Sequence, residues 1–135
     1  MIKKEKYFYI NTIQDLDLDY IKNIVKLDNR IFLMINKKNI GAGQSRNIAI
    51  KKARGKFIGF LDADDVWKAN KLKIQLKFMK ENKYKISHTS YEVISNKNKV
   101  IGKRVARNFI YEKDLLKSCD IGLSTVILEK NIMSK

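Results

Sequence analysis

The stretch that most constrains the fold runs from Gly55 to Asp65, where an apolar segment leads directly into a group of carboxylates. Phe57 to Leu61 is an uninterrupted apolar run with the length of a buried strand. Asp62, Asp64 and Asp65 follow it, although acidic side chains are scarce, with 14 Asp and Glu against 29 Lys and Arg. Because open α/β sheets bind ligands at the carboxyl ends of their strands, this loop is the best candidate for chemistry.

Carboxylates at this spacing repel one another unless a cation or hydrogen-bond donors offset their charge. One interpretation is a site for Mg²⁺ or Mn²⁺, which take oxygen ligands from carboxylates and substrate phosphates. The other is a solvated turn in which Asp65 caps a helix near Lys68. The acidic residues by themselves leave both interpretations open.

Apolar spacing predicts strands that alternate with helices over the first two-thirds of the chain. Strands are expected over residues 7–10, 31–35, 57–61, 86–94 and 100–101, with an extended run over 124–128. Helices are expected over 18–27, with Asp15 or Asp17 as cap, and over about 45–53, 68–82 and 112–117. This alternation predicts an α/β fold with a largely parallel sheet.

The size and composition of the chain indicate one globular domain over residues 1–135. No apolar run approaches the roughly 20 residues of a membrane span, and the N-terminus has no apolar stretch typical of a signal peptide. A single cysteine, Cys119, excludes an internal disulfide and suits a reducing compartment. We therefore expect a cytoplasmic protein.

The net charge of +15 has three interpretations. Basic proteins attract nucleic acid, and they also attract anionic membrane surfaces. The third interpretation is compositional, because Lys, Ile and Asn are abundant and the lysines are dispersed. No arginine-rich or aromatic-basic RNA-binding motif is present, so we expect no specific nucleic-acid partner. We favour the compositional interpretation of the charge, and association with a membrane surface or an anionic substrate is the next one.

A second candidate segment is the glycine-containing loop from Asn39 to Asn47. Gly41 would let the backbone approach a ligand, and the helix that follows would offer free N–H groups. Arg46 adds a guanidinium group suited to phosphate oxygens. The pattern is neither a Walker A motif nor a complete dinucleotide fingerprint, so this loop alone favours an ordinary strand-to-helix turn.

Taken together, the spaced motifs resemble family 2 glycosyltransferases of the GT-A fold. The residues that carry the resemblance are Asn39-x-Gly-x-Gly-x-Ser-Arg-Asn47, the segment from Ala53 to Trp67, and Lys71-Leu-Lys-Ile-Gln75. The resemblance extends weakly through Ser87–Tyr91 to Ile121–Val126, over about residues 28–130. It implies a GT-A-like, Rossmann-like three-layer α/β domain with a mostly parallel sheet.

The resemblance also implies a donor site for a nucleotide sugar, expected to be a UDP-sugar, with a divalent metal, Mn²⁺ or Mg²⁺. By position, Asp64 and Asp65 would contact the ribose and the metal, and Asp62 would support them. Arg46 would lie near the nucleotide, and Asn39 and Gly41 would shape its pocket. The implied reaction is an inverting transfer to a glycan or lipid-linked acceptor, in polysaccharide biosynthesis. The expected location is the cytoplasm, with peripheral association on the inner membrane face as the alternative.

Several family features are not visible in this sequence. The opening Pro-x-Tyr-Asn-like turn is absent, and Ala69 stands where the family usually has Pro. The downstream Glu-Asp pair that supplies the general base is not found, so the catalytic residue is unknown and is expected beyond the C-terminus. These departures predict an incomplete domain that has little or no turnover by itself. The alternatives are a non-catalytic nucleotide-binding remnant and a basic nucleic-acid-binding protein.

Overall fold

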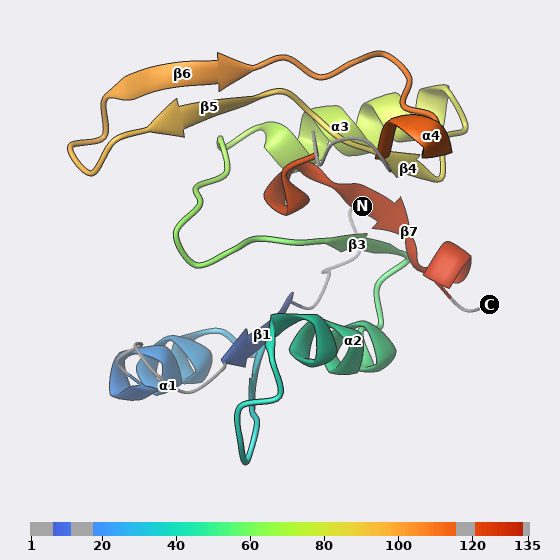
Figure 1. Ribbon diagram of the computed structural model, residues 1–135. Coiled ribbons are helices and arrows are strands. Elements are labelled where there is room, and N and C mark those ends of the chain that lie inside the picture. The colour runs from blue at the N-terminus through green and yellow to red at the C-terminus, as the bar shows by residue number, and fades with distance from the viewer. Residues whose placement is uncertain (1–6, 12–17, 116–120, 134–135) are drawn as a thin grey trace. The chain divides into compact units, whose positions relative to one another are not determined.

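The structure, a computed structural model, describes residues 7–11, 18–115 and 121–133 (Figure 1). The chain divides into two compact units, residues 1–56 and residues 57–135, and each is described by itself. Helices and strands make up both units, so the α/β character expected from the sequence is confirmed. No helix within the described ranges is both long enough and apolar enough to cross a membrane.

Unit 1 contains two parallel strands and two helices, in the order β1 (Tyr7–Asn11), α1 (Leu18–Leu27), β2 (Ile31–Ile35) and α2 (Ala42–Lys52). The apolar run that forms β2 has the bounds expected from the sequence. On α1, Ile21 is buried, whereas Leu27 is 87% exposed. The expected caps Asp15 and Asp17 lie outside the described residues.

Unit 2 is organised around a three-stranded sheet in the order β3-β7-β4, in which β7 is antiparallel to both neighbours. The sheet strands are β3 (Phe57–Gly59), β4 (Ile86–Ser87) and β7 (Ile127–Glu129), and α3 (Lys71–Glu81) lies between β3 and β4 in the chain. The remaining elements are the antiparallel hairpin β5 (Tyr91–Ile94) and β6 (Val100–Arg104), the helix α4 (Glu112–Leu115), and the 3₁₀ turns η1 (Leu123–Thr125) and η2 (Lys130–Met133).

The core of unit 2 combines α3 with the central strand β7. Met79 of α3 and Ile127 of β7 are each only 1% exposed, and Ile58, Val126 and Leu128 are also buried. Burial of these apolar side chains is the main force that holds the helix on the sheet. The core therefore fixes the positions of the segments that leave β3 and lead into β7.

The expectation of a largely parallel sheet holds only for the β1–β2 pair among the described strands. In the three-stranded sheet, β7 lies between β3 and β4 and is antiparallel to both, and β5 and β6 form a separate antiparallel hairpin. The strand expected over 57–61 ends at Gly59, since β7 offers only three paired residues, and Phe60 and Leu61 continue without a ladder.

Several further elements differ in their bounds from the sequence expectation; β6, for example, runs from Val100 to Arg104 where the sequence predicts a strand over 100–101. The expected strand over 86–94 is two strands, β4 and β5, separated by residues 88–90. Helix α3 begins at Lys71 rather than near Lys68, because a turn closed by the hydrogen bond from Lys71 N–H to Lys68 O precedes it. The extended run expected over 124–128 is divided between η1 and β7. Strand pairing limits β4 and β7, whereas a local turn sets the start of α3.

Candidate functional site

The acidic loop of unit 2 forms a tight turn shortly after β3. Asp65 N–H donates to Asp62 O at 3.1 Å, which places Ala63 and Asp64 at the centre of the turn. Asp64 and Asp65 are exposed, and their carboxylates form no hydrogen bond or ion pair with a residue that the structure describes. Two neighbouring carboxylates are therefore accessible to a ligand at one place.

A single buried serine holds both sides of this loop. The hydroxyl oxygen of Ser124 accepts the backbone N–H of Asp62 at 3.0 Å, and its carbonyl oxygen accepts the indole N–H of Trp67 at 2.7 Å. Ser124 is only 8% exposed, so both bonds are protected from competing water. Ser124 of η1 thus holds the acidic turn on both sides. It bonds to Asp62, the first residue of the turn, and to Trp67, which follows the last residue, Asp65.

Trp67 packs directly on the end of β3. A Cβ atom built on Gly59 would lie 3.0 Å from Cη2 of Trp67, so a larger residue would force the indole to shift by a few tenths of an ångström. The ring is half-buried and its N–H is satisfied by Ser124. The indole thus lies against β3, with its polar atom bonded within unit 2.

A polar network continues behind the acidic turn along α3. Lys71 Nζ lies 4.8 Å from the centre of the Trp67 ring and donates to Gln75 Oε1 at 2.6 Å. Gln75 is 4% exposed, and its Nε2 donates to Thr125 O and Ser87 Oγ, each at 3.0 Å. Partial burial lowers the pKa of the Lys71 ammonium. The network connects the start of α3 with η1 and with the end of β4.

In unit 1, the glycine-containing loop has the geometry of a helix start. Asn39 Oδ1 accepts the N–H of Gly41 at 2.9 Å, and Gly41 adopts a φ of +80°, a conformation that favours glycine. The hydroxyl of Ser45, which is 3% exposed, donates to Gly41 O at 2.9 Å and accepts from Asn36 Nδ2 at 2.8 Å. The structure thus brings the predicted residues Asn39 and Gly41 together.

Helix α2 begins three residues earlier than the sequence predicted, at Ala42. The positive φ of Gly41 ends the preceding loop and allows the helix to start there. Arg46 lies within the helix, and its side chain is half-buried. The first turn of α2 contains no acidic residue, so its N-terminal end has no local negative charge to oppose an anion.

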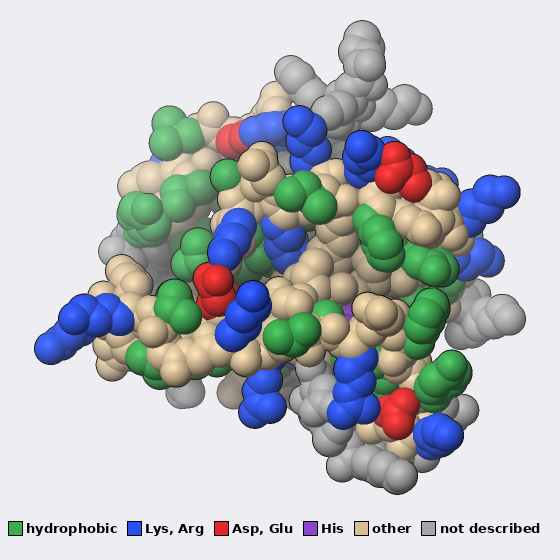
Figure 2. Space-filling view, turned by 90° about the horizontal axis from the view of Figure 1, so that it is seen from above, with side chains coloured by type: hydrophobic (Ala, Val, Ile, Leu, Met, Phe, Trp, Pro, Cys, Tyr) green, Lys and Arg blue, Asp and Glu red, His purple; other side chains and the backbone are tan. Residues whose placement is uncertain are grey.

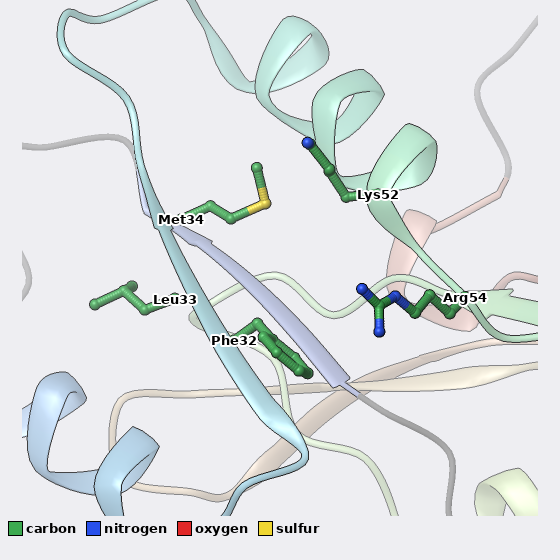
Figure 3. A pocket seen from close by; sticks show the side chains of 5 residues that line it. All are labelled: Phe32, Leu33, Met34, Lys52 and Arg54. Carbon is green, nitrogen blue, oxygen red and sulfur yellow. The ribbon is translucent and has the colours of Figure 1, made fainter.

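A separate cavity of about 280 Å³ opens in unit 1 between β2 and the C-terminal end of α2 (Figure 3). Phe32 and Met34 point from β2 toward the end of α2, where Lys52 and Arg54 lie, and Leu33 completes the lining. None of the site residues predicted from the sequence lines this cavity.

The predicted site residues fall into two groups. Asp62, Asp64 and Asp65 share one turn of unit 2, whereas Asn39, Gly41 and Arg46 belong to unit 1. Within the described ranges, no three His, Cys, Asp or Glu side chains gather into a group that could hold a metal ion. The donor set nevertheless suits a hard cation, because two exposed carboxylates supply the ligand type that Mg²⁺ and Mn²⁺ prefer when substrate oxygens complete the coordination.

Sequence reasoning assigned no role to Ser124, Thr125 or Gln75. The visible signal was weak: an adjacent Ser-Thr pair interrupts an otherwise apolar run, and a glutamine follows Lys71 by one helical turn. Buried polar side chains need partners, so these positions indicated hydrogen bonds but not which loop they would support.

Comparison with known proteins places the chain in a family. Residues 11–134 match the family described as Glycosyl transferase family 2, and the chain therefore belongs to the family 2 glycosyltransferases.

Among individual relatives, the UDP-Glc:alpha-D-GlcNAc-diphosphoundecaprenol beta-1,3-glucosyltransferase WfgD of Escherichia coli is 44% identical over 107 residues, which are 79% of this chain and 42% of that protein. The putative teichuronic acid biosynthesis glycosyltransferase TuaG of Bacillus subtilis is 34% identical over 113 residues, 83% of this chain and 45% of that protein. An uncharacterized glycosyltransferase of Rickettsia felis is 40% identical over 133 residues, 94% of this chain and 22% of that protein. The chain thus spans less than half the length of each of these relatives.

Proposed function

We propose that the chain carries the donor-binding part of an inverting glycosyltransferase with a GT-A-like fold. Its ligand is a nucleoside-diphosphate sugar that binds together with Mn²⁺ or Mg²⁺. The proposed donor is a UDP-sugar, because the name of WfgD contains UDP-Glc. The acceptor is a glycan or a lipid-linked glycan, because WfgD is named for a diphosphoundecaprenol acceptor and TuaG for teichuronic acid biosynthesis.

The observation that carries the proposal is the acidic turn. It presents the carboxylates of Asp64 and Asp65 to solvent, while its backbone is attached to the buried Ser124. Placing two like charges on a turn costs free energy, and a cation bound between the protein and a diphosphate would offset that cost. A rigid loop would also hold the carboxylates in place for the ligand without a large loss of entropy on binding.

In this proposal Asp65 and Asp64 hold the metal, and Asp64 and Asp62 contact the nucleotide. The roles given to Asn39, Gly41 and Arg46 stay predictions from the sequence, because these residues belong to unit 1. The bound metal would act as a Lewis acid toward the negative charge that develops on the departing nucleoside diphosphate. The protein's own contribution at this turn is to hold the backbone that carries the two carboxylates, through the bonds of Asp62 to Asp65 and to Ser124.

The test is a titration of UDP by calorimetry, with Mn²⁺, with Mg²⁺ and with a chelator. We expect binding that requires the metal and that falls by about tenfold or more in Asp65→Asn, since this change removes a charged ligand. The matched control is Glu81→Gln, which removes one exposed carboxylate from the same unit at the end of α3.

Metal-dependent UDP binding that is lost in Asp65→Asn and kept in Glu81→Gln supports the donor site. UDP binding that does not depend on the metal, or equal losses in the two variants, contradicts it. Absence of UDP binding together with salt-sensitive RNA binding would favour the alternative of a nucleic-acid-binding protein. Hydrolysis or transfer of a UDP-sugar by the chain then separates an enzyme from a nucleotide-binding remnant.

A further inference from the structure

The β5–β6 hairpin is a surface of unit 2 that the donor site does not use. Its strands pair antiparallel, and the turn between them is closed by the hydrogen bond from Ser95 N–H to Lys99 O at 2.8 Å. In Figure 1 this turn projects beyond the other segments of unit 2. A two-stranded hairpin is only marginally stable in water by itself. A partner that binds the projecting end would therefore stabilise the hairpin.

The projecting end of the hairpin exposes aliphatic side chains. Ile94, Val100 and Ile101 are 42%, 60% and 68% exposed, and Val93 is 40% exposed. A single exposed aliphatic residue is ordinary for a protein surface. Here Ile94 is paired with Val100, and Ile101 follows at the irregularity in the pairing, so these three lie together at one end of the hairpin and favour contact with an apolar phase.

The same segment is strongly basic. Residues 93–111 contain no Asp or Glu and five basic residues, namely Lys97, Lys99, Lys103, Arg104 and Arg107. The hairpin's one acidic residue, Glu92, accepts a hydrogen bond from Lys68 at 2.9 Å, and this contact holds the pKa of the Glu92 carboxyl below its usual range. The charge of the hairpin is therefore complementary to an anionic surface.

We propose that the β5–β6 hairpin docks on an anionic lipid surface. Ile94, Val100 and Ile101 enter the interface, while the lysines around the turn contact phosphate headgroups. An anionic bilayer supplies both properties that the hairpin matches, negative charge at the surface and an apolar layer directly below it. On the face shown in Figure 2, hydrophobic and basic side chains are interspersed and acidic ones are few.

Nucleic acid matches the hairpin less well. Single-stranded nucleic acid is bound by a basic groove together with aromatic side chains on which bases stack. The three residues at the projecting end are aliphatic and offer no stacking surface, and the exposed aromatic residues of the basic segment, Phe109 and Tyr111, lie beyond the end of β6. This inference goes beyond the donor site and does not depend on it, since it concerns a different part of unit 2 and needs no nucleotide or metal.

The test is sedimentation of the full chain with vesicles of phosphatidylcholine alone and of phosphatidylcholine mixed with phosphatidylglycerol. We expect the protein to sediment with the mixed vesicles and to remain in solution with the neutral ones. Ile101→Ser should lower the partition coefficient by roughly fivefold because it removes apolar burial. The matched control, Ile74→Ser, changes an aliphatic residue of α3 that is 65% exposed and should leave partitioning unchanged.

The charge component has its own pair of variants. Lys97→Gln combined with Lys99→Gln should lower partitioning by about tenfold, and Lys77→Gln combined with Lys80→Gln on α3 removes the same charge elsewhere in the unit. Equal losses in the two double variants, or full binding by Ile101→Ser, would mean nonspecific adsorption and would overturn the proposal. Equal binding to neutral vesicles would overturn it too, as would displacement from vesicles by single-stranded RNA at lower concentration than the lipid. Circular dichroism melts of each variant confirm that the fold is kept.

Discussion

Ser124 accepts the backbone N–H of Asp62 at 3.0 Å, although the two residues are 62 positions apart in the sequence. The same serine accepts the indole N–H of Trp67 through its carbonyl oxygen. The side chain of Ser124 therefore supports the acidic turn through one bond that a mutation can remove, while the main-chain bond to Trp67 remains.

Ser124→Ala should lower the free energy of unfolding by about 1 kcal/mol, because the buried N–H of Asp62 loses its acceptor. If the turn binds a metal-linked diphosphate, the affinity for UDP with Mn²⁺ should also fall several-fold. Chemical denaturation and calorimetry measure the two effects.

Ser87→Ala is the matched control for that change. It also removes a serine hydroxyl acceptor in unit 2, but its partner Gln75 Nε2 keeps the carbonyl oxygen of Thr125 at 3.0 Å. Stability should change little, and UDP affinity should not change. If both serine variants lose the same affinity, the effect is a general loss of packing and the specific role of Ser124 is rejected.

Two glycine substitutions should have opposite effects. Gly59→Ala places a methyl group 3.0 Å from Cη2 of Trp67, so the indole must move away from its position beside β3. We expect a loss of roughly 1–3 kcal/mol in the free energy of unfolding and a shift in the fluorescence of Trp67, the only tryptophan. An unchanged emission spectrum would argue against the packing described.

Gly43→Ala should instead stabilise the chain by about 0.5–1 kcal/mol. Gly43 lies inside α2, and a Cβ atom built there meets nothing within 4 Å. Thermal melts of this variant and Gly59→Ala, made in parallel, compare a glycine that helix formation does not need with one that tertiary packing requires.

The pH dependence of stability should carry a contribution from Lys71. Burial lowers the pKa of its ammonium in the folded chain, so between that lowered pKa and the usual value the unfolded chain binds more protons. The contribution of Lys71 to stability must therefore increase as the pH rises through this window. We expect the wild type to gain stability relative to Lys71→Met on raising the pH from neutrality toward 10.5. Parallel stability curves for the two proteins would contradict the expectation.

The core of unit 2 should respond strongly to truncation at one face of α3. Met79→Ala removes a side chain that is 1% exposed and should cost about 2–5 kcal/mol in the free energy of unfolding. Ile74→Ala on the exposed face of the same helix, where 65% of the side chain is accessible, should stay within about 0.5 kcal/mol of the wild type. Urea denaturation with unchanged slopes would make the two values comparable.

Local patterns predicted the elements whose limits are local. The strand Ile31–Ile35 is confirmed to the residue, because a five-residue apolar run between polar segments has few alternatives. The turn at Asp62–Asp65 also follows from local chemistry, since Asp side chains and a short spacing favour turns.

Other features could not be predicted because they depend on segments that are distant in sequence. Nothing in residues 57–61 indicates that only three of them will find a partner, since that partner is the short strand β7. The antiparallel insertion of β7 carries no periodic signal in either neighbouring strand. Among the site residues, Asn39, Gly41 and the acidic turn were visible as motifs, whereas the buried support from Ser124 was not.

The position of β7 between β3 and β4 has a consequence for how the chain folds while it is being translated. Residues 57–59 and 86–87 do not pair with each other in the sheet. Their backbone hydrogen bonds can form only when residues 127–129 lie between them. Contacts with such long sequence separation form late, because a large loop must close before any bond is gained. On the ribosome, the acidic turn would emerge long before the serine that supports it, so a nascent chain should be sensitive to proteolysis at residues 62–67 until residues 124–129 have left the exit tunnel.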